Sequence, residues 1–351
     1  MKTAIVYDRV NKWGGAERVL LTLHEMFPSA PLYTSVYNSK TASWAKVFPK
    51  VYTSFLQNFP FAKNNHELYA ALMPIAFESF NFDEYDLVIS VTSESAKGIL
   101  VKPGTKHICY MLTPTRYLWN GYEEYFKNPI LKFISTPVTN YLRNWDKVAA
   151  YRPDKIVSIS SEVKKRVKKF YNLESEVIFP PTSLSTGSDK HGSNYYLVVS
   201  RLVPYKRLNL AVEAFNRLKY PLVIVGTGSE QNNLKFMSHK NIKFAGKVSE
   251  EELVKYYSSC RALIFPQEED FGLTAVEAQS FGKPVIAYKA GGSLDTIIDG
   301  RTGVFFNEQN WQALYDAVKR FEKMKFDSKI IIRNAGRFSK ERFKKEFLKL
   351  I

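Results

Sequence analysis

Short apolar runs and longer stretches with helical spacing alternate along the first half of the chain. The strand-like runs are residues 3–7, 31–37, 85–90, 107–111, 154–160 and 176–181, and the helix-like stretches are 15–27 and 161–171. Strands that alternate with helices indicate a mostly parallel sheet. The pattern therefore predicts a doubly wound α/β unit.

The same alternation restarts after residues 180–194, PPTSLSTGSDKHGSN, a stretch without periodicity that predicts a domain boundary. The strand-like runs beyond it are 195–200, 221–226, 241–246, 261–266, 283–288 and 303–306, and the helix-like stretches are 206–218, 249–259, 273–281 and 309–324. We predict two Rossmann-like domains, 1–180 and 181–333, that face a central cleft. Residues 334–351 have the spacing of an amphipathic helix that crosses back onto the first domain.

Composition and charge narrow the class of protein. The 351 residues, 45% of them hydrophobic, suffice for two globular cores, and a net charge of +16 favours polyanions such as nucleic acid, anionic lipid or phosphorylated small molecules. No export signal or spanning segment is evident, which predicts a cytoplasmic protein with peripheral membrane contact at most. Two cysteines and five histidines show neither disulfide nor metal-ligand spacing: Cys109, Cys260, His24, His66, His107, His191 and His239.

Two cations follow the strand at 195–200. Arg201 and Lys206 lie where the carboxyl end of a parallel strand would present them to a ligand. An Arg fork and a Lys point charge together suit a diphosphate. The alternative is a solvated loop.

Two glutamates lie around the next candidate site. Glu269 falls on the loop 267–272 and Glu277 within the helix 273–281, whose first turn has free N–H groups that attract phosphate. Carboxylates suit hydroxyl groups, so one nucleotide diphosphate with ribose and sugar hydroxyls would explain the cations and the glutamates together. Taken singly, Glu277 as an exposed helix residue and Glu269 as part of an acidic loop are the simpler alternatives.

Other residues give weaker signals. Gly14 and Gly15 lie between a strand and a helix, where a ligand can approach the backbone closely, or where the chain merely turns. Gly226 and Gly228 are interpreted mainly as turn residues. Asp8 ends the first strand and is interpreted as a cap or turn residue in preference to a site residue.

Together these segments resemble glycosyltransferase family 4, the retaining nucleotide-sugar transferases of the GT-B fold, and are most similar to bacterial O-antigen and exopolysaccharide mannosyltransferases. The resemblance covers nearly the whole chain. It is carried by GGAERVL, TSFLQNFP, YDLVIS with AKG, TPTRYLWN, VIFPP, SRLVPYKR, EEDFGLTAVEAQSFGKPVIAY and DGRTGVFFNEQ.

The resemblance implies a role for each matching position. Arg201 and Lys206 would hold the donor diphosphate, Glu277 the ribose hydroxyls, and Glu269 the transferred sugar near its reacting carbon. The remaining implied contacts are backbone N–H groups of Gly272, Leu273 and Thr274, Val248 beside the base, and Gly14 and Gly15 on the opposite wall of the cleft. The expected donor is GDP-mannose, with no metal and no further cofactor.

The chain departs from the family pattern at the positions of its cleft histidines. Leu112 precedes Thr113 and Pro114 where relatives have a histidine, and Thr92 and Ser93 stand where they read Ser-Ser-His. Relatives also have Asp at two positions where this chain has Asn120 and the pair Thr182, Ser183. The departures leave the donor sugar open, while a front-face displacement, in which the leaving diphosphate takes the acceptor proton, needs neither histidine nor an enzyme nucleophile.

The acceptor is expected on the first domain, at the aromatic segment 55–82, and a polyprenyl diphosphate-linked saccharide is the expected class. The helix 161–171 combines five basic residues with apolar ones, which indicates contact with an anionic membrane surface or a solvated helix. The alternatives are a UDP-sugar donor, a nucleotide-sugar epimerase of the same fold, a non-catalytic nucleotide-sugar binder, and a nucleic-acid-binding protein, for which no motif is present.

Overall fold

The computed structural model describes residues 1–126, 128–182 and 194–351. Ser183 and His191, and with them most of the predicted boundary 180–194, lie outside the described residues. The chain forms two compact units, one of Met1–Pro180 with Lys344–Ile351 and the other of Pro181–Phe343. Each unit is described by itself.

The first unit contains a seven-stranded parallel sheet in the order β3-β2-β1-β4-β5-β6-β7. Its strands are β1 (Thr3–Tyr7), β2 (Leu32–Thr34), β3 (Val51–Thr53), β4 (Leu87–Thr92), β5 (Lys106–Met111), β6 (Lys155–Ser158) and β7 (Glu176–Val177). Every residue of the central strands β1 and β4 is buried, as expected for a parallel sheet covered on both faces. Seven of the eleven residues in these two strands are Val, Ile or Thr, whose branched side chains pack well on a pleated surface.

The connections of the first unit are helical but uneven in length. The helices are α1 (Gly15–Met26), α2 (Met73–Glu78), α3 (Tyr122–Tyr125), α4 (Pro129–Ala149), α5 (Ser161–Tyr171) and the end of α13 (Lys340–Leu348), and the 3₁₀ turns are η1 (Ser43–Val47), η2 (Phe55–Asn58), η3 (His66–Leu72) and η4 (Ala96–Gly98). One core cluster joins Leu56, Met73, Phe77 and Phe82 to the sheet. The segment 55–82 is therefore partly core, although Phe61 and Leu68 remain exposed.

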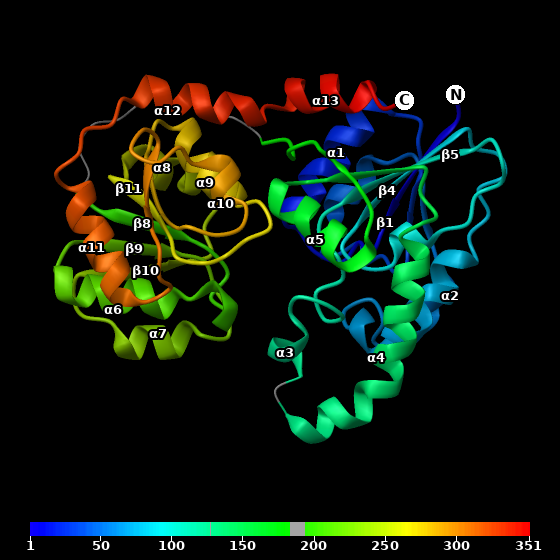
Figure 1. Ribbon diagram of the computed structural model, residues 1–351, viewed down its shortest axis with the longest axis horizontal. Coiled ribbons are helices and arrows are strands. Elements are labelled where there is room, and N and C mark those ends of the chain that lie inside the picture. The colour runs from blue at the N-terminus through cyan, green and yellow to red at the C-terminus, as the bar shows by residue number, and fades with distance from the viewer. Residues whose placement is uncertain (127, 183–193) are drawn as a thin grey trace. The chain divides into compact units, whose positions relative to one another are not determined.

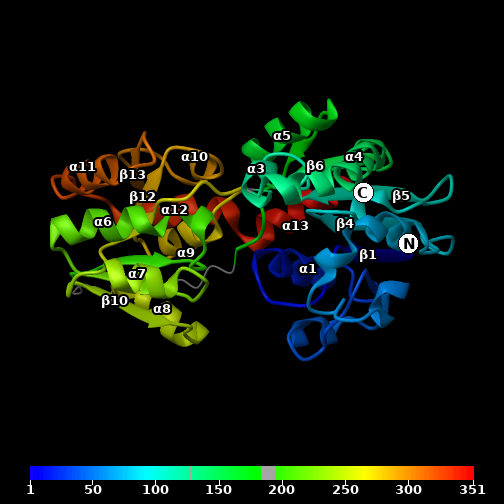
Figure 2. The same cartoon turned by 90° about the horizontal axis from the view of Figure 1, so that it is seen from below.

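The second unit contains a six-stranded parallel sheet in the order β10-β9-β8-β11-β12-β13. Its elements are β8 (Tyr196–Val199), η5 (Pro204–Lys206), α6 (Leu208–Leu218), β9 (Leu222–Val225), α7 (Gln231–Met237), β10 (Ile242–Gly246), α8 (Glu250–Ser259), β11 (Ala262–Phe265), α9 (Leu273–Ser280), β12 (Val285–Tyr288), α10 (Ser293–Thr296), β13 (Gly303–Phe306), α11 (Trp311–Phe321), α12 (Ser328–Ala335) and η6 (Gly336–Phe338). One core cluster lies between this sheet and α6 and α11, and a second lies between the sheet and α8 and α9. Figures 1 and 2 show the sheet between these two helical layers.

The C-terminal residues return to the first unit. Lys344 Nζ lies 2.8 Å from Glu25 Oε2, Lys106 Nζ donates to the carbonyl of Ile351 (3.1 Å), and the ring of Phe347 packs against Tyr110. The prediction of one helix over residues 334–351 is wrong. These residues form the end of α12, then η6 and then α13.

The interruption has a local cause. The carbonyl of Phe338 accepts hydrogen bonds from the N–H (2.9 Å) and Oγ1 (2.8 Å) of Thr182. The break itself falls at Ser339, whose backbone is extended (φ −68°, ψ 156°) and whose Oγ accepts a hydrogen bond from the N–H of Arg342 (3.2 Å) at the start of α13. None of the helices in the described ranges has both the length and the apolar content that crossing a membrane demands.

Candidate functional site

Glycines bring two loops together at the carboxyl edge of the second unit's sheet. The loop after β8 and the loop after β9 are joined by a hydrogen bond from Leu202 N to Thr227 O (2.9 Å). Gly226 has φ +129°, and a Cβ there would lie 1.9 Å from the carbonyl oxygen of Ser200; at Gly228 it would lie 2.3 Å from that of Leu202. The turn interpretation of these glycines is thus incomplete, because each also permits contact with the loop that carries Arg201.

A second glycine pair, which the sequence reasoning missed, connects the loops after β11 and β12. Gly292 N donates to the carbonyl of Glu269 (2.8 Å). A Cβ at Gly291, where φ is +61°, would lie 2.4 Å from that same carbonyl oxygen, and one at Gly292 would lie 2.3 Å from Phe271 Cα. The Gly-Gly after the strand 283–288 was the available signal.

Lys206 and Glu269 contact each other directly. Lys206 ends η5, and its ammonium donates to Glu269 Oε1 on the loop between β11 and α9. The side chains retain only 10% and 20% exposure. Partial burial strengthens the attraction relative to a surface pair, so the two groups are fixed beside each other before any ligand arrives. The structure thereby joins two of the predicted site residues.

Arg201 lies on the surface of the same edge. Its Nη2 donates to the hydroxyl of Tyr205, and the ring of Tyr205 is centred 4.9 Å from the ammonium of Lys206. Tyr205 therefore contacts both cations, an arrangement the sequence reasoning did not foresee. In this conformation the guanidinium stays exposed, where it can turn toward an anion.

Helix α9 begins at the same loop. Its N-cap Gly272 has φ +89°, a conformation that favours glycine, and has no side chain with which to cap the helix. A Cβ would also lie 3.0 Å from the ring of Phe265. The first-turn N–H groups, including those of Leu273 and Thr274, are the donors to which an anion can bind.

Glu277 is buried in the middle of α9, so the alternative of an exposed helix residue is wrong. Only 9% of the residue is exposed, and its Oε2 accepts a hydrogen bond from the Tyr257 hydroxyl at 2.8 Å. Tyr257 stacks on Phe281, and the half-buried Val248 packs against the same core cluster. A carboxylate that is buried and held by an aromatic hydroxyl keeps one orientation.

Gly14 and Gly15 begin α1 of the first unit. Gly14 is an exposed N-cap in extended conformation, and Gly15 is the first helical residue. The carboxylate of Glu17, in the first turn, is buried and accepts from the Tyr7 hydroxyl at 3.2 Å. Burial raises the pKa of Glu17 above its ordinary value.

Asp8 has a structural role, but it binds a distant loop and not, as the sequence had suggested, its own strand end or turn. Its carboxylate accepts hydrogen bonds from Thr92 Oγ1 and from the N–H groups of Ser93, Glu94 and Ala96, at 2.6 to 3.0 Å. These bonds fix the loop that follows β4. Burial, reinforced by repulsion from Glu94, raises the pKa of Asp8.

A buried cluster at the same strand ends escaped the sequence reasoning. Arg9 Nη1 donates to Glu94 Oε1 at 2.5 Å, and Nε2 of the buried His66 lies 3.6 Å from Glu94 Oε2. Burial by itself would raise the pKa of Glu94, but the charge of Arg9 and the contact with His66 hold it at about 2. Only the fold shows this cluster, because its residues come from three distant segments.

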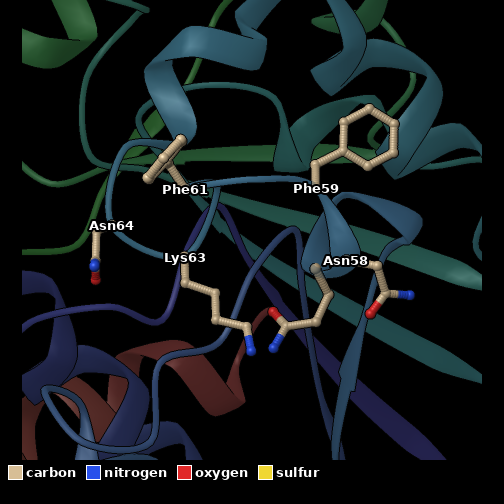
Figure 3. Close-up of a pocket in the computed structure, with 6 residues that line it drawn as sticks. Asn58, Phe59, Phe61, Lys63 and Asn64 are labelled. Carbon is tan, nitrogen blue, oxygen red and sulfur yellow. The ribbon is translucent and has the colours of Figure 1, made fainter.

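The structure contains a pocket of about 440 Å³ in the first unit (Figure 3). It is lined by Gln57, Asn58, Phe59, Phe61, Lys63 and Asn64. These residues belong to the aromatic segment predicted for the acceptor, and they offer two rings, amide groups and one cation. None of the predicted donor-binding residues lines this pocket.

Metal ligands do not gather among the residues that the structure describes: no three His, Cys, Asp or Glu side chains are placed to hold an ion. Cys109 and Cys260 are both buried free thiols. Burial raises the pKa of each to about 12. Both are therefore unreactive apolar side chains at neutral pH.

A known protein family matches the part of the sequence that forms most of the second unit. Residues 185–338 match the family model described as glycosyl transferases group 1. Among curated proteins, the chain is 28% identical over 189 residues to the D-rhamnosyltransferase WbpZ of Pseudomonas aeruginosa, covering 50% of this chain and 49% of that protein. It is 24% identical over 231 residues to the O-antigen chain mannosyltransferase C of Escherichia coli, covering 62% and 61%. The chain thus spans about half to three fifths of the length of these relatives.

Solved structures match the chain over its full length. The structure of Anabaena HepE in complex with UDP and glucose aligns with a TM-score of 0.70 at 19% identity, covering 100% of this chain and 99% of that one. At that identity the likeness shows the fold alone. The predicted GT-B fold is confirmed, and the second unit matches the group 1 glycosyl transferase domain.

Proposed function

We propose that this chain, whose second unit matches the group 1 glycosyl transferases, is a retaining glycosyltransferase that moves a sugar from a nucleotide-sugar onto a lipid-linked saccharide. One observation carries the proposal most directly. The ammonium of Lys206 and the carboxylate of Glu269 contact each other at the strand edge that also holds the first turn of α9. A cation, a carboxylate and free N–H groups at one place match a diphosphate joined to a sugar.

The donor is proposed to lie along this edge. Lys206, together with Arg201 after rotation away from Tyr205, would hold the diphosphate with the N–H groups of Gly272, Leu273 and Thr274. Glu269 would accept from sugar hydroxyls, Glu277 from the ribose hydroxyls, and Val248 would contact the base. We favour GDP-mannose, supported by the sequence resemblance and by the mannosyltransferase among the relatives. UDP-glucose is the alternative, since HepE was crystallised with UDP and glucose.

The proposed reaction is a displacement on one face of the sugar. The bond from the sugar C1 to the phosphate oxygen breaks, and the acceptor oxygen bonds to C1 on the same face. The acceptor proton passes to the leaving diphosphate oxygen, so atoms and charge balance without an enzyme nucleophile or a metal. Lys206 and Arg201 would stabilise the charge that grows on the leaving group.

The acceptor is proposed to bind the first unit. The pocket shown in Figure 3 offers the amide of Asn58 for sugar hydroxyls and the rings of Phe59 and Phe61 for sugar faces, while the amide of Gln57 is bonded to the backbone of Tyr37. Gly14 and Gly15 leave the backbone at the start of α1 open to a second contact. The lipid part of the acceptor implies a membrane nearby, and the net charge of +16 would favour an anionic one.

The site is tested by separating binding from turnover. Lys206→Ala is expected to weaken binding of UDP or GDP and to lower transfer about 10²- to 10³-fold, because a cation on the leaving group is lost. Glu269→Gln is expected to lower transfer similarly while nucleoside diphosphate binds as tightly or more so, since a carboxylate near phosphate is removed. Calorimetric titration with UDP and GDP, and radiolabelled transfer with each donor sugar, measure the two effects.

Lys323→Ala is the matched control, because this lysine is exposed beyond α11. It should leave binding and transfer unchanged. Transfer at the unchanged rate in both Lys206→Ala and Glu269→Gln would contradict the proposal. Consumption of donor without an acceptor would favour an epimerase, and tight nucleotide binding without any turnover would favour a non-catalytic binder.

A further inference from the structure

Helix α4 carries an apolar face that its own unit leaves uncovered. Six apolar residues share one side of the helix with spacings of three, four, seven and eight. They are Ile130, Phe133, Ile134, Val138, Tyr141 and Val148, exposed to 69, 82, 66, 44, 46 and 62%. The opposite side of α4 is the one that packs, through Thr139, Leu142, Asp146 and Ala149. We call the six exposed residues the α4 stripe.

The stripe is unusual for a helix in a folded unit. A surface helix normally turns its apolar side to the core and its polar side to water. In α4 the apolar residues face outward along almost the full 21-residue helix, a length of roughly 27 Å from Ile130 to Val148 at 1.5 Å per residue. Exposed apolar surface of this extent marks an interaction site.

Charge around the stripe selects the kind of partner. Asp146, the one acidic residue in the α4 sequence, is buried against Lys97, and Lys132 pairs with Glu123 of α3 at 2.7 Å, whereas Arg143 and Lys147 stay at least partly exposed. Helix α5 adds exposed lysines at 164, 165, 168 and 169. Its Tyr171 hydroxyl donates to Asp146 (2.7 Å), which joins α5 to α4, and Figure 2 shows both helices near β6. An apolar face with basic flanks matches an anionic lipid surface.

Helix α5 cannot supply the apolar contact itself. Its Val163 and Val167 are buried in the first unit, so the side that remains exposed is basic. The membrane contact that the sequence placed on α5 alone is therefore shared by two helices. α5 supplies charge, and α4 supplies the surface that enters the lipid.

A second copy of this chain fits the stripe less well. A stable dimer takes about 20–30 residues from each partner, and the stripe has six. Two copies joined at α4 would also bring their basic flanks together. Neither objection applies to a bilayer, which is flat, apolar below its headgroups and negatively charged at its surface.

We propose that the α4 stripe inserts into the headgroup region of an anionic membrane, with α4 lying parallel to the surface. The biological role of this membrane contact rests on the proposed transfer to a lipid-linked acceptor. The binding itself requires neither donor nor acceptor. If the first unit lies on the membrane through α4, its proposed acceptor pocket is held within reach of a lipid-linked sugar.

The first experiment compares variants in vesicle sedimentation without donor or acceptor. Vesicles contain phosphatidylcholine with or without phosphatidylglycerol. Phe133→Ser combined with Ile134→Ser is expected to lower the partition coefficient on the anionic vesicles at least about tenfold, because apolar surface no longer leaves water. The matched control is Phe236→Ser, since Phe236 on α7 is 92% exposed and lies in the other unit. It should bind like the unchanged protein.

The second experiment measures insertion. A fluorophore that responds to polarity is attached at Ile134→Cys or, as control, at Phe236→Cys. Position 134 alone is expected to shift to the blue and to be quenched by brominated lipid. Because Cys109 and Cys260 are buried, the introduced thiol is the one labelled.

Three results would overturn the assignment: equal vesicle binding by the Phe133/Ile134 variant, loss of binding only on Lys164→Gln with Lys165→Gln, or a dimer in solution that the α4 variant makes monomeric. Loss of binding only in the lysine variant would mean that the protein adsorbs to the vesicles by charge alone. A dimer that the α4 variant makes monomeric would mean that the stripe binds a second copy of this chain. Calorimetric binding of UDP and GDP to the same variants keeps the donor site separate. Its retention alongside failed vesicle binding would reject the membrane face and leave the proposed transferase intact.

Discussion

Single buried ionisable residues fix much of the first unit. Lys97 Nζ donates to Asp146 Oδ1 at 2.5 Å, and the other carboxylate oxygen accepts from Trp119 Nε1 and the Tyr171 hydroxyl, both at 2.7 Å. Every partner comes from a different segment, so one carboxylate joins η4, the loop before α3, α4 and α5. Breaking such a pair by removing one partner leaves a buried charge uncompensated, which typically costs about 3–5 kcal/mol.

His107 makes the stability of the first unit depend on pH. Burial lowers its pKa to about 3, and its Nε2 pairs with Ser90 Oγ at 2.8 Å. The unfolded chain binds a proton below about pH 6.5, which the folded state does not accept until about pH 3. As the pH is lowered from about 6.5 to about 3, the free energy of unfolding should therefore decrease, by up to about 1.4 kcal/mol per pH unit from this group.

The measurement is urea unfolding at several pH values between 4 and 7, for the unchanged protein and His107→Gln. In the variant, we expect the slope of the free energy of unfolding against pH to decrease by the amount that corresponds to about one bound proton. His239→Gln, at an exposed histidine of the second unit, is the control and should keep the slope. An unchanged slope in His107→Gln would show that other groups cause the acid sensitivity.

At the scale of elements, the candidate donor site depends on how tightly four loops pack. The strands of the second unit place the loops after β8, β9, β11 and β12 at one edge, and Gly226, Gly228, Gly291 and Gly292 let their backbones meet. The loop after β11 carries Glu269, and the loop after β8 carries Arg201 and leads to Lys206. Side-chain geometry at the site is thus determined by backbone contacts several residues away.

Gly226→Ala is expected to disturb this packing without touching a site residue. The added Cβ would meet the Ser200 carbonyl oxygen at 1.9 Å, at a φ of +129° that disfavours alanine. We expect a loss of stability of about 1–3 kcal/mol and weaker binding of nucleoside diphosphate. Thermal unfolding and calorimetric titration measure both.

Gly336→Ala is the matched control for this substitution. Its Cβ would meet nothing within 4 Å, and its φ of −57° is helical. Stability should stay the same or rise by up to about 1 kcal/mol. If both variants bind nucleotide like the unchanged protein, loop packing does not position Arg201.

At the scale of the whole molecule, the chain finishes in the unit where it began. Residues Lys344–Ile351 belong to the first unit, although Pro181–Phe343 form the second. Phe347 and Leu350 are buried there, so residues from the far side of the second unit in sequence complete the core of the first. The first unit accordingly depends on residues more than 150 positions beyond its main segment, Met1–Pro180.

Phe347→Ala should destabilise the first unit selectively. The side chain is fully buried against Tyr110, and loss of a buried phenyl ring costs about 3–5 kcal/mol. Hydrogen exchange followed by mass spectrometry should show faster exchange in β1, β4 and β5 with little change in β8 and β11. Leu348→Ala, at a residue 56% exposed, should change neither set. Equal acceleration in both units would contradict the assignment of this segment to the first unit.

Much of the fold could be predicted because its signals are local. The run 262–265 is apolar throughout and 3–7 is apolar after Thr3, and Ser249 with Glu252 forms the capping box that begins α8, so strands and helices are evident from spacing alone. The longest helix, α4, was not predicted, since its outward apolar side and its internal Pro137 disguise the usual helical pattern. The break before α13 was missed, although Ser339, whose hydroxyl accepts from the N–H of Arg342, was a helix start signal present in the sequence.

The sequence by itself determined two parallel α/β units and the carboxylates and cations that flank α9, because residue type and spacing along the chain are enough to specify both. Only the tertiary structure decided that Lys206 meets Glu269, that Glu277 is buried against Tyr257, that Arg9, His66 and Glu94 form one cluster, and that α4 turns its apolar side outward. The physical reason is that contact, burial and exposure depend on segments far apart in sequence, and periodicity describes only neighbours on one element.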